Sequence, residues 1–139
     1  MSPKMFGNEL TKLAQVDTVR AWAPGKWGLE IQKYFPTERI RYIEFQPLGN
    51  RDFACLKGFQ NLERLSIRLL RMDKTNFDYP VLPKLSTIEL YTFNLDNPKV
   101  IQWLKQLPSL KKIQLRTNSI DEIRRRFEGE FPDVVFEAT

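Results

Sequence analysis

The stretch Leu110-Lys-Lys-Ile113-Gln-Leu115-Arg-Thr-Asn118-Ser-Ile120 is the most regular part of this chain of 139 residues. Its apolar positions follow the pattern L-x-x-I-x-L-x-x-N-x-I. Ile113 and Leu115 stand two residues apart, and alternate side chains of a β-strand lie on the same face. The stretch therefore predicts a short strand with one buried face, followed by residues that return the chain to the start of another strand.

The same apolar triplet recurs along the chain. It is found as Val16, Val19, Ala21; Ile40, Ile43, Phe45; Leu62, Leu65, Ile67; Leu85, Ile88, Leu90; Leu110, Ile113, Leu115; and Phe131, Val134, Phe136. Successive triplets begin 24, 22, 23, 25 and 21 residues apart. Apolar residues are common, but six triplets at so even a spacing indicate an internal repeat.

This pattern resembles that of the leucine-rich-repeat family over about residues 16–136. The resemblance implies an α/β fold: a leucine-rich-repeat solenoid with a short parallel β-sheet on the concave side and helices and irregular loops on the convex side. One unit cannot bury its own apolar face, so neighbouring units stack around a shared core. We expect a single domain, with residues 1–15 as an N-terminal helical cap and residues 16–139 as a repeat domain of about five to six units.

One position departs from the family pattern. Family members carry an asparagine after the strand, which packs inside and bonds the backbone of the neighbouring unit. Here the position holds Pro24, Leu48, Leu70, Phe93 and Asn118. We therefore expect this asparagine ladder to be largely absent and the turns after the strands to be irregular.

Two return segments have the features of helices. Asn97 and Pro98 suit the N-cap and the first helical position of one helix. Residues Ser119–Glu130 predict the other, in which Ser119 and Glu122 have capping-box spacing. Its expected inward stripe is Ile120, Ile123 and Phe127.

The other return segments are less regular. Apolar spacing predicts a third helix from Trp27 to Phe35 and one turn within Asp52–Gly58, with Phe53 and Leu56 inward. Residues Leu70–Val81 show no clear period, so we expect them to be extended or looped. Core packing best explains Trp27 and Trp103.

Few catalytic chemistries are open to this sequence. It contains no histidine and one cysteine, Cys55, which lies in the apolar context of a buried structural thiol. Metal-ligand spacings and glycine-rich phosphate loops are absent from the sequence. We expect a protein that is not an enzyme, with no catalytic residue, metal, cofactor or small-molecule substrate.

The chain lacks an apolar run of the roughly 18 residues that a membrane span needs, and its first 15 residues lack the apolar core of a signal peptide. With a single cysteine it suits a reducing compartment. We expect a soluble, cytoplasmic protein with no membrane partner. The starting methionine and the expected end caps favour a complete chain over a fragment of a larger protein.

The strand residues that alternate with the core are the best candidates for a binding site. Arginine and aromatic residues, which dominate binding hot spots, are prominent among them. The expected partner-binding residues are Trp22, Tyr42, Arg64, Arg68, Glu89, Tyr91, Lys112 and Arg116. Trp22, which belongs to the weakest triplet, could instead pack under the N-terminal cap.

Mixed charge with aromatic residues suits a protein partner, so we expect a protein–protein interaction module such as an adaptor, an inhibitor or an antidote to an enzyme. The alternative is a nucleic-acid-binding protein. It rests on the pI of about 9.4 and the run Arg124-Arg125-Arg126, although the net charge of +5 is spread along the chain. A solvent-exposed helix face with ion pairs between residues four apart is the simpler explanation of that run, because Glu122, Glu128 and Glu130 flank it.

Overall fold

The structure, a computed structural model, describes residues 17–22, 36–46, 53–68, 79–90 and 98–138. Within them the fold is α/β, with six parallel strands in one sheet and two α-helices. The strands are β1 (Thr18–Trp22), β2 (Tyr42–Phe45), β3 (Arg64–Ile67), β4 (Thr87–Leu90), β5 (Lys112–Leu115) and β6 (Val135–Ala138). The helices are α4 (Pro98–Gln106), α5 (Ile120–Phe127) and a 3-10 turn, η3 (Cys55–Gly58).

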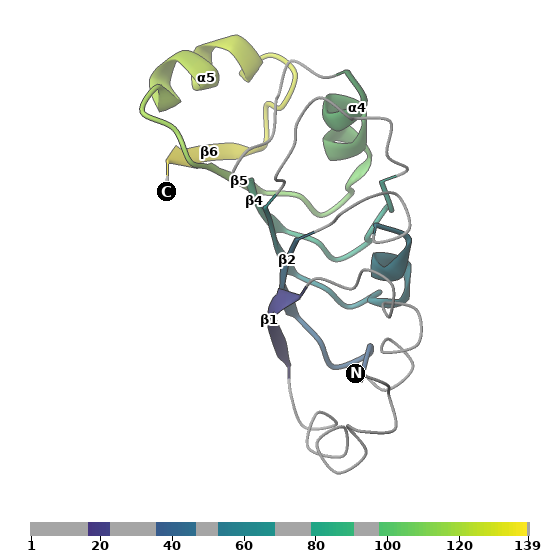
Figure 1. The fold of residues 1–139 in the computed structure, drawn as a ribbon. Coiled ribbons are helices and arrows are strands. Elements are labelled where there is room, and N and C mark those ends of the chain that lie inside the picture. The colour runs from purple at the N-terminus through teal and green to yellow at the C-terminus, as the bar shows by residue number, and fades with distance from the viewer. Residues whose placement is uncertain (1–16, 23–35, 47–52, 69–78, 91–97, 139) are drawn as a thin grey trace.

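The strands follow one another across the sheet in chain order. Each strand therefore pairs with the next one along the chain. The described return segments η3 and α4 lie on the side of the molecule opposite the strands (Figure 1). Helix α5 lies beyond β6, at the C-terminal end of the stack (Figure 1). The core fills the space between the strands and the return segments.

The predicted triplets occupy equivalent places in the four central strands. Ile43, Leu65, Ile88 and Ile113 stand opposite one another, and so do Phe45, Ile67, Leu90 and Leu115. All eight side chains are buried. The alternation of apolar and polar residues thus sets the register of this part of the sheet, because a shift by one residue would expose every core side chain.

Backbone hydrogen bonds tie each unit to the next in a repeated way. The carbonyl groups of Asp17, Arg41, Glu63 and Ser86 each accept two N–H groups from the start of the following strand, at 2.8 to 3.3 Å. The four junctions from β1 to β5 therefore share one backbone geometry, although the return segments between them differ in length and kind.

Side-chain bonds between units precede the strands. The Asn61 amide donates to the Glu38 carbonyl at 2.9 Å, and the Ser109 hydroxyl donates to the Pro83 carbonyl at 2.7 Å. Asn118, which alone fits the family's asparagine position, is exposed and does not pack inside. In the described units, polar side chains before the strands bond the neighbouring unit, whereas the family pattern places such bonds after the strands.

Aromatic rings run through the core across several units. Tyr79 stacks on Trp103 with 4.8 Å between ring centroids and meets Phe53 edge-on at 5.0 Å. Phe53 in turn contacts Phe45, whose ring lies 5.7 Å from that of Trp22. Offset and edge-on ring pairs add to the stabilisation from burial. Trp103 is thus a core residue, as predicted, and so is the buried thiol of Cys55.

The C-terminal end of the core is closed by three phenylalanines. Phe127 of α5 stacks on Phe136 of β6 with centroids 6.2 Å apart, and Phe131 meets Phe136 edge-on at 5.9 Å. Phe127 is buried, and Ile120 and Ile123 pack against the core, so the expected inward stripe of this helix is confirmed.

Two of the three predicted helices lie within the described residues and are confirmed, although α5 ends at Phe127 and not at Glu130. Helix α4 begins at Pro98, as predicted. Leu56 within η3 and Phe53 just before it are both buried, which confirms their expected inward position. The capping box at the start of α5 is wrong, because the Ser119 side chain makes no cap hydrogen bond. Instead, the Ser119 backbone N–H donates to the Thr117 hydroxyl at 3.0 Å.

Two predictions at the ends of the sheet need correction. The register of β1 shifts between Val19 and Trp22, so Trp22 pairs with Phe45 and is 7% exposed within the core. Its expected place on the exposed strand face is therefore wrong. At the other end Phe136, not Val134, stands opposite Ile113, which moves the last unit by two residues. Stacking on Phe127 favours this register, because it buries the larger side chain.

Several predicted features lie outside the described residues. They are the N-terminal cap within residues 1–15, the helix from Trp27 to Phe35, the cap residue Asn97 and the binding residue Tyr91. The same holds for most of Leu70–Val81, of which residues 79–81 form neither helix nor strand.

The substitution Ser109→Ala tests the side-chain bonds between units. We expect it to lower the free energy of unfolding by about 1 kcal/mol, because the Pro83 carbonyl loses its donor. Urea unfolding followed by circular dichroism measures the change. Ser119→Ala is the matched control and should cost less than about 0.5 kcal/mol, because its hydroxyl makes no cap bond. A larger loss at Ser119 than at Ser109 would contradict this assignment.

Candidate functional site

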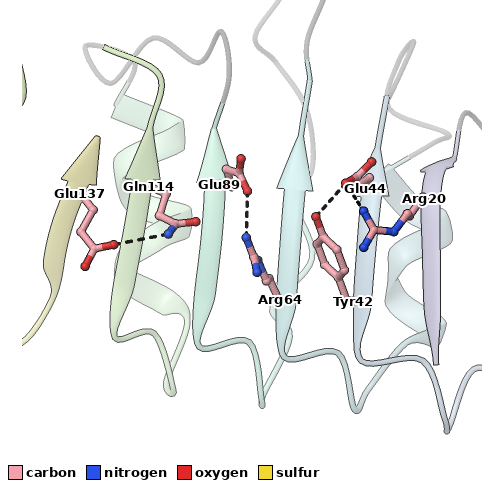
Figure 2. A network of polar contacts seen from close by, with 7 residues as sticks. All are labelled: Arg20, Tyr42, Glu44, Arg64, Glu89, Gln114 and Glu137. Carbon is pink, nitrogen blue, oxygen red and sulfur yellow. Dashed lines mark hydrogen bonds and ion pairs between the residues drawn. The ribbon is translucent and has the colours of Figure 1, made fainter. Parts of the chain in front are cut away.

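The side chains that alternate with the core form the strand face, defined here by Arg20, Tyr42, Glu44, Arg64, Ser66, Thr87, Glu89, Lys112, Gln114, Val135 and Glu137. Along β2 and β5 these positions are partly exposed, while their neighbours in the strand are buried. Figure 2 shows seven of the side chains projecting from the same side of the sheet. The strand face is polar, in contrast to the apolar opposite face.

Three ion pairs cross this face, each between neighbouring strands. Arg20 on β1 lies 3.5 Å from Glu44 on β2. Arg64 on β3 lies 3.3 Å from Glu89 on β4, and Lys112 on β5 lies 3.5 Å from Glu137 on β6. Odd-numbered strands supply the cations and even-numbered strands the carboxylates. These three cations and three carboxylates balance, so the charged side chains that define the strand face carry no net charge.

Tyr42 joins the first two ion pairs. Its hydroxyl donates to Glu44 Oε1 at 2.9 Å, and its ring lies between the Arg20 and Arg64 guanidinium groups, 5.7 and 4.9 Å from the centroid (Figure 2). A cation over an aromatic face is stabilised by the ring quadrupole. Burial, followed by the bond to Glu44, raises the pKa of Tyr42 to about 12. The hydroxyl therefore remains a protonated donor throughout the physiological pH range.

Two polar residues in the middle of the strand face are buried. Ser66 is 2% exposed and Glu89 is 7% exposed. Ser66 lies between Glu44 and Glu89 in the register of the sheet. A buried carboxylate needs a charged or hydrogen-bonding partner, and Glu89 has one in Arg64. Glu89 thus holds Arg64 in place and offers little surface to a partner.

Gln114 connects β5 with β6. Its amide nitrogen donates to Glu137 Oε2 at 3.4 Å (Figure 2). Its Oε1 is buried and has no hydrogen-bond partner among the residues that the structure describes. The chain of polar contacts is therefore interrupted between Glu89 and Gln114, which stand opposite each other in the sheet.

The ends of the strands are more basic. Arg68 follows β3 and Arg116 follows β5, and both are exposed. Arg116 makes no side-chain hydrogen bond or ion pair within the described part of the chain. Its guanidinium group is therefore available to an external acceptor.

Of the eight predicted binding residues, the structure brings four together on the strand face: Tyr42, Arg64, Glu89 and Lys112. Arg68 and Arg116 lie just past the strands, Trp22 lies in the core, and Tyr91 is outside the described residues. The predicted set omitted Arg20, Glu44 and Glu137. Each of these residues stands 24 or 25 positions from a residue of opposite charge, about one repeat away, and this spacing could have predicted ion pairs between neighbouring strands.

Other kinds of site find little support in the described residues. They contain no group of three or more cysteine, aspartate or glutamate residues arranged to hold a metal ion. None of the helices described is both long and apolar enough to cross a bilayer. The strand face presents guanidinium groups, a phenol and carboxylates that contact one another across neighbouring strands.

The chain matches no model of a known protein family, no characterised protein and no solved structure in the comparisons with these three groups.

Proposed function

We propose that the chain is a short, irregular leucine-rich-repeat protein that binds another protein through its strand face. The repeat assignment is supported by the triplets, the sequential parallel strands and the shared backbone geometry at four junctions. The family resemblance implies a non-enzymatic scaffold that recognises a protein partner. The chain has one cysteine, Cys55, which is buried and cannot form a disulfide within the chain, and this is consistent with a reducing, cytoplasmic location.

The observation that carries the binding proposal is the setting of Arg64. Its side chain is 47% exposed, yet it is held between the Tyr42 ring and the Glu89 carboxylate. A side chain that is fixed before binding loses less conformational entropy on association. Arginine and tyrosine are also the residue types that contribute most to binding hot spots. The strand face thus presents a preorganised anchor to a protein surface.

The same contacts favour a protein over a nucleic acid. Nucleic-acid binding requires cations that are available to phosphate groups. On the strand face Arg20, Arg64 and Lys112 are each paired with a carboxylate. In the run on α5, Arg124 bonds Asp121 and the Phe136 carbonyl, and Arg126 lies over the Phe127 ring. Of the three arginines, Arg125 alone makes no such contact with the described residues, and one free guanidinium group is few for phosphate binding.

The substitution Thr87→Arg tests the proposal by blocking the middle of the strand face. The purified variant and the parent chain are used to capture proteins from extract of the source cells, with quantification by mass spectrometry. We expect the specifically captured partner to fall by about tenfold or more, because a long charged side chain prevents close packing. Retention of the chain on heparin at near-physiological salt would instead favour the nucleic-acid alternative.

Gln102→Arg is the matched control. Gln102 is exposed on α4, on the opposite side of the molecule, so this variant gains the same charge and a similar bulk away from the strand face. It should capture the partner as the parent does. Equal capture by both variants would refute binding through the strand face, provided that their thermal midpoints match that of the parent.

A further inference from the structure

A second recognition site lies at the C-terminal end of the molecule. A groove of about 630 Å³ runs between α5 and β6. Its apolar lining includes Phe131, Val134, Val135 and Phe136, and Arg124 and Arg125 lie beside it. Val135 is 53% exposed and is one of the two large apolar side chains with substantial exposure among the described residues. Phe131 and Phe136 are themselves almost covered, so Val135 is the main exposed apolar side chain of the groove, and it lies beside two guanidinium groups.

The groove lies along the last strand of the described sheet, whose outer edge would ordinarily invite pairing with another strand. Arg124 occupies part of that edge, because its Nε donates to the Phe136 carbonyl at 2.9 Å. A second strand would have to displace this bond. The groove therefore favours a ligand held by side-chain contacts over one that extends the sheet.

Unoccupied guanidinium donors beside the groove favour an anion. Arg124 bonds Asp121 through Nη1 at 3.1 Å and Phe136 through Nε, so its second terminal nitrogen has no partner in the described residues. Arg125 has no hydrogen-bond or ion-pair partner there either. One carboxylate, Glu128, also lines the groove. With Asp121 paired to Arg124, the two guanidinium groups and two carboxylates balance in charge. The feature that complements a carboxylate is therefore the set of unoccupied N–H donors on Arg125 and Arg124.

The exposure of the groove favours a peptide over a small molecule. Small-molecule sites bury most of the surface of their ligand. The half-exposed Val135 and the exposed Arg124 and Arg125 form an open wall that could cover only one side of a compact ligand. An extended chain, in contrast, can lay an apolar side chain on the groove while the rest of it stays in solvent.

We propose that the groove between α5 and β6 binds an extended segment of a protein partner in which an acidic residue adjoins an apolar one. The apolar side chain covers Val135 and its apolar neighbours, and the carboxylate bonds Arg125 and the open nitrogen of Arg124. This site is separate from the middle of the strand face and does not depend on the function proposed above.

Fluorescence anisotropy of the whole chain with a labelled peptide, fluorescein-Gly-Glu-Leu-Glu-Leu-Gly-amide, tests the proposal. We expect saturable binding that weakens about tenfold with Arg125→Gln, because a charge-assisted hydrogen bond is lost. Arg126→Gln changes the net charge equally on the same helix, but Arg126 lies over the Phe127 ring and does not line the groove. It should change the affinity less than about twofold. Equal effects of the two variants would show that only net charge attracts the peptide.

Three further arms complete the test. Replacing both peptide glutamates with glutamine, or both leucines with alanine, should each abolish saturable binding, and unchanged binding of either would overturn the proposal. Unlabelled 4-phenylbutyrate should not compete at concentrations at which the unlabelled peptide does, and competition would identify a small-molecule site instead. The Thr87→Arg variant should bind the peptide normally, so that failure at the strand face and failure at the groove are distinguishable.

Discussion

Replacing Trp103 with alanine is expected to lower the free energy of unfolding by about 4 kcal/mol. Trp103 is 2% exposed, and its ring stacks on Tyr79. Its indole N–H donates to the Pro80 carbonyl at 2.7 Å. The substitution would leave a cavity between α4 and the residues before β4. It would also remove the donor of a buried carbonyl, and both losses act in the same direction.

Guanidinium unfolding monitored by circular dichroism measures this loss. Domains of this size are stable by only about 5–15 kcal/mol, so a large part of the total would disappear. Trp103→Phe separates the two contributions, because it keeps a ring beside Tyr79 but loses the hydrogen bond. We expect it to cost about 2 kcal/mol. Gln102→Ala, at the adjacent exposed position, should cost less than about 0.5 kcal/mol. A loss of under about 1.5 kcal/mol for Trp103→Ala would mean that Trp103 does not hold α4 in place.

The second large effect is expected at Ser66, the buried residue between two carboxylates. Ser66→Asp would place three negative charges in adjacent register positions, with Glu44 on one side and Glu89 on the other. Like charges opposite each other in a sheet are destabilising, and a buried charge without a partner costs more. Arg64 already pairs with Glu89, so it cannot fully compensate a third carboxylate. We expect a loss of about 3 kcal/mol at neutral pH.

Ser66→Asn is the matched control, because it introduces a side chain of the same shape without the charge. The difference between the two variants is therefore the quantity to measure, by urea unfolding at pH 7 and again near pH 3. It should shrink at the lower pH, because the new carboxyl group becomes protonated there. A difference that stays constant with pH would mean that steric crowding, and not charge, destabilises the aspartate variant.

Much of the sheet could be predicted from the sequence, because the relevant signal is periodic. Ile88 and Leu90 alternate with polar residues and recur at the same interval as Ile113 and Leu115, so both the strands and their register follow from one pattern. The helix that begins at Pro98 was predictable for a local reason, since proline suits the first helical position.

The ends of the sheet could not be predicted in the same way. Ideal alternation places Trp22 on the face opposite Val19, but the irregularity between them turns the indole into the core. Such a shift depends on the tertiary contacts with Phe45 and Phe59. In the last unit Val134 and Phe136 are both apolar, so two registers satisfy the pattern. Only the packing of Phe127 against Phe136 distinguishes between them.

The strand face was predicted as a surface but not as a set of contacts. Sequence spacing places Tyr42, Arg64 and Lys112 at equivalent positions on one face of the sheet, and the structure confirms these positions. Sequence spacing does not reveal that Glu89 is almost wholly buried or that Arg64 lies against the Tyr42 ring. These properties depend on which rotamers long side chains adopt across strands, and that is decided by their neighbours in space.

The sequential order of the strands has a consequence for how the chain folds. Each new strand from β2 to β6 pairs with one whose partner residue lies only 22 to 25 positions away, as in the pairs Tyr42–Arg64 and Thr87–Lys112. The entropy lost on closing a loop grows only slowly with its length. Every addition of a strand therefore meets nearly the same entropic barrier, and no step requires the distant ends of the chain to meet. Structure can accordingly begin at the well-packed central strands and spread outward one unit at a time.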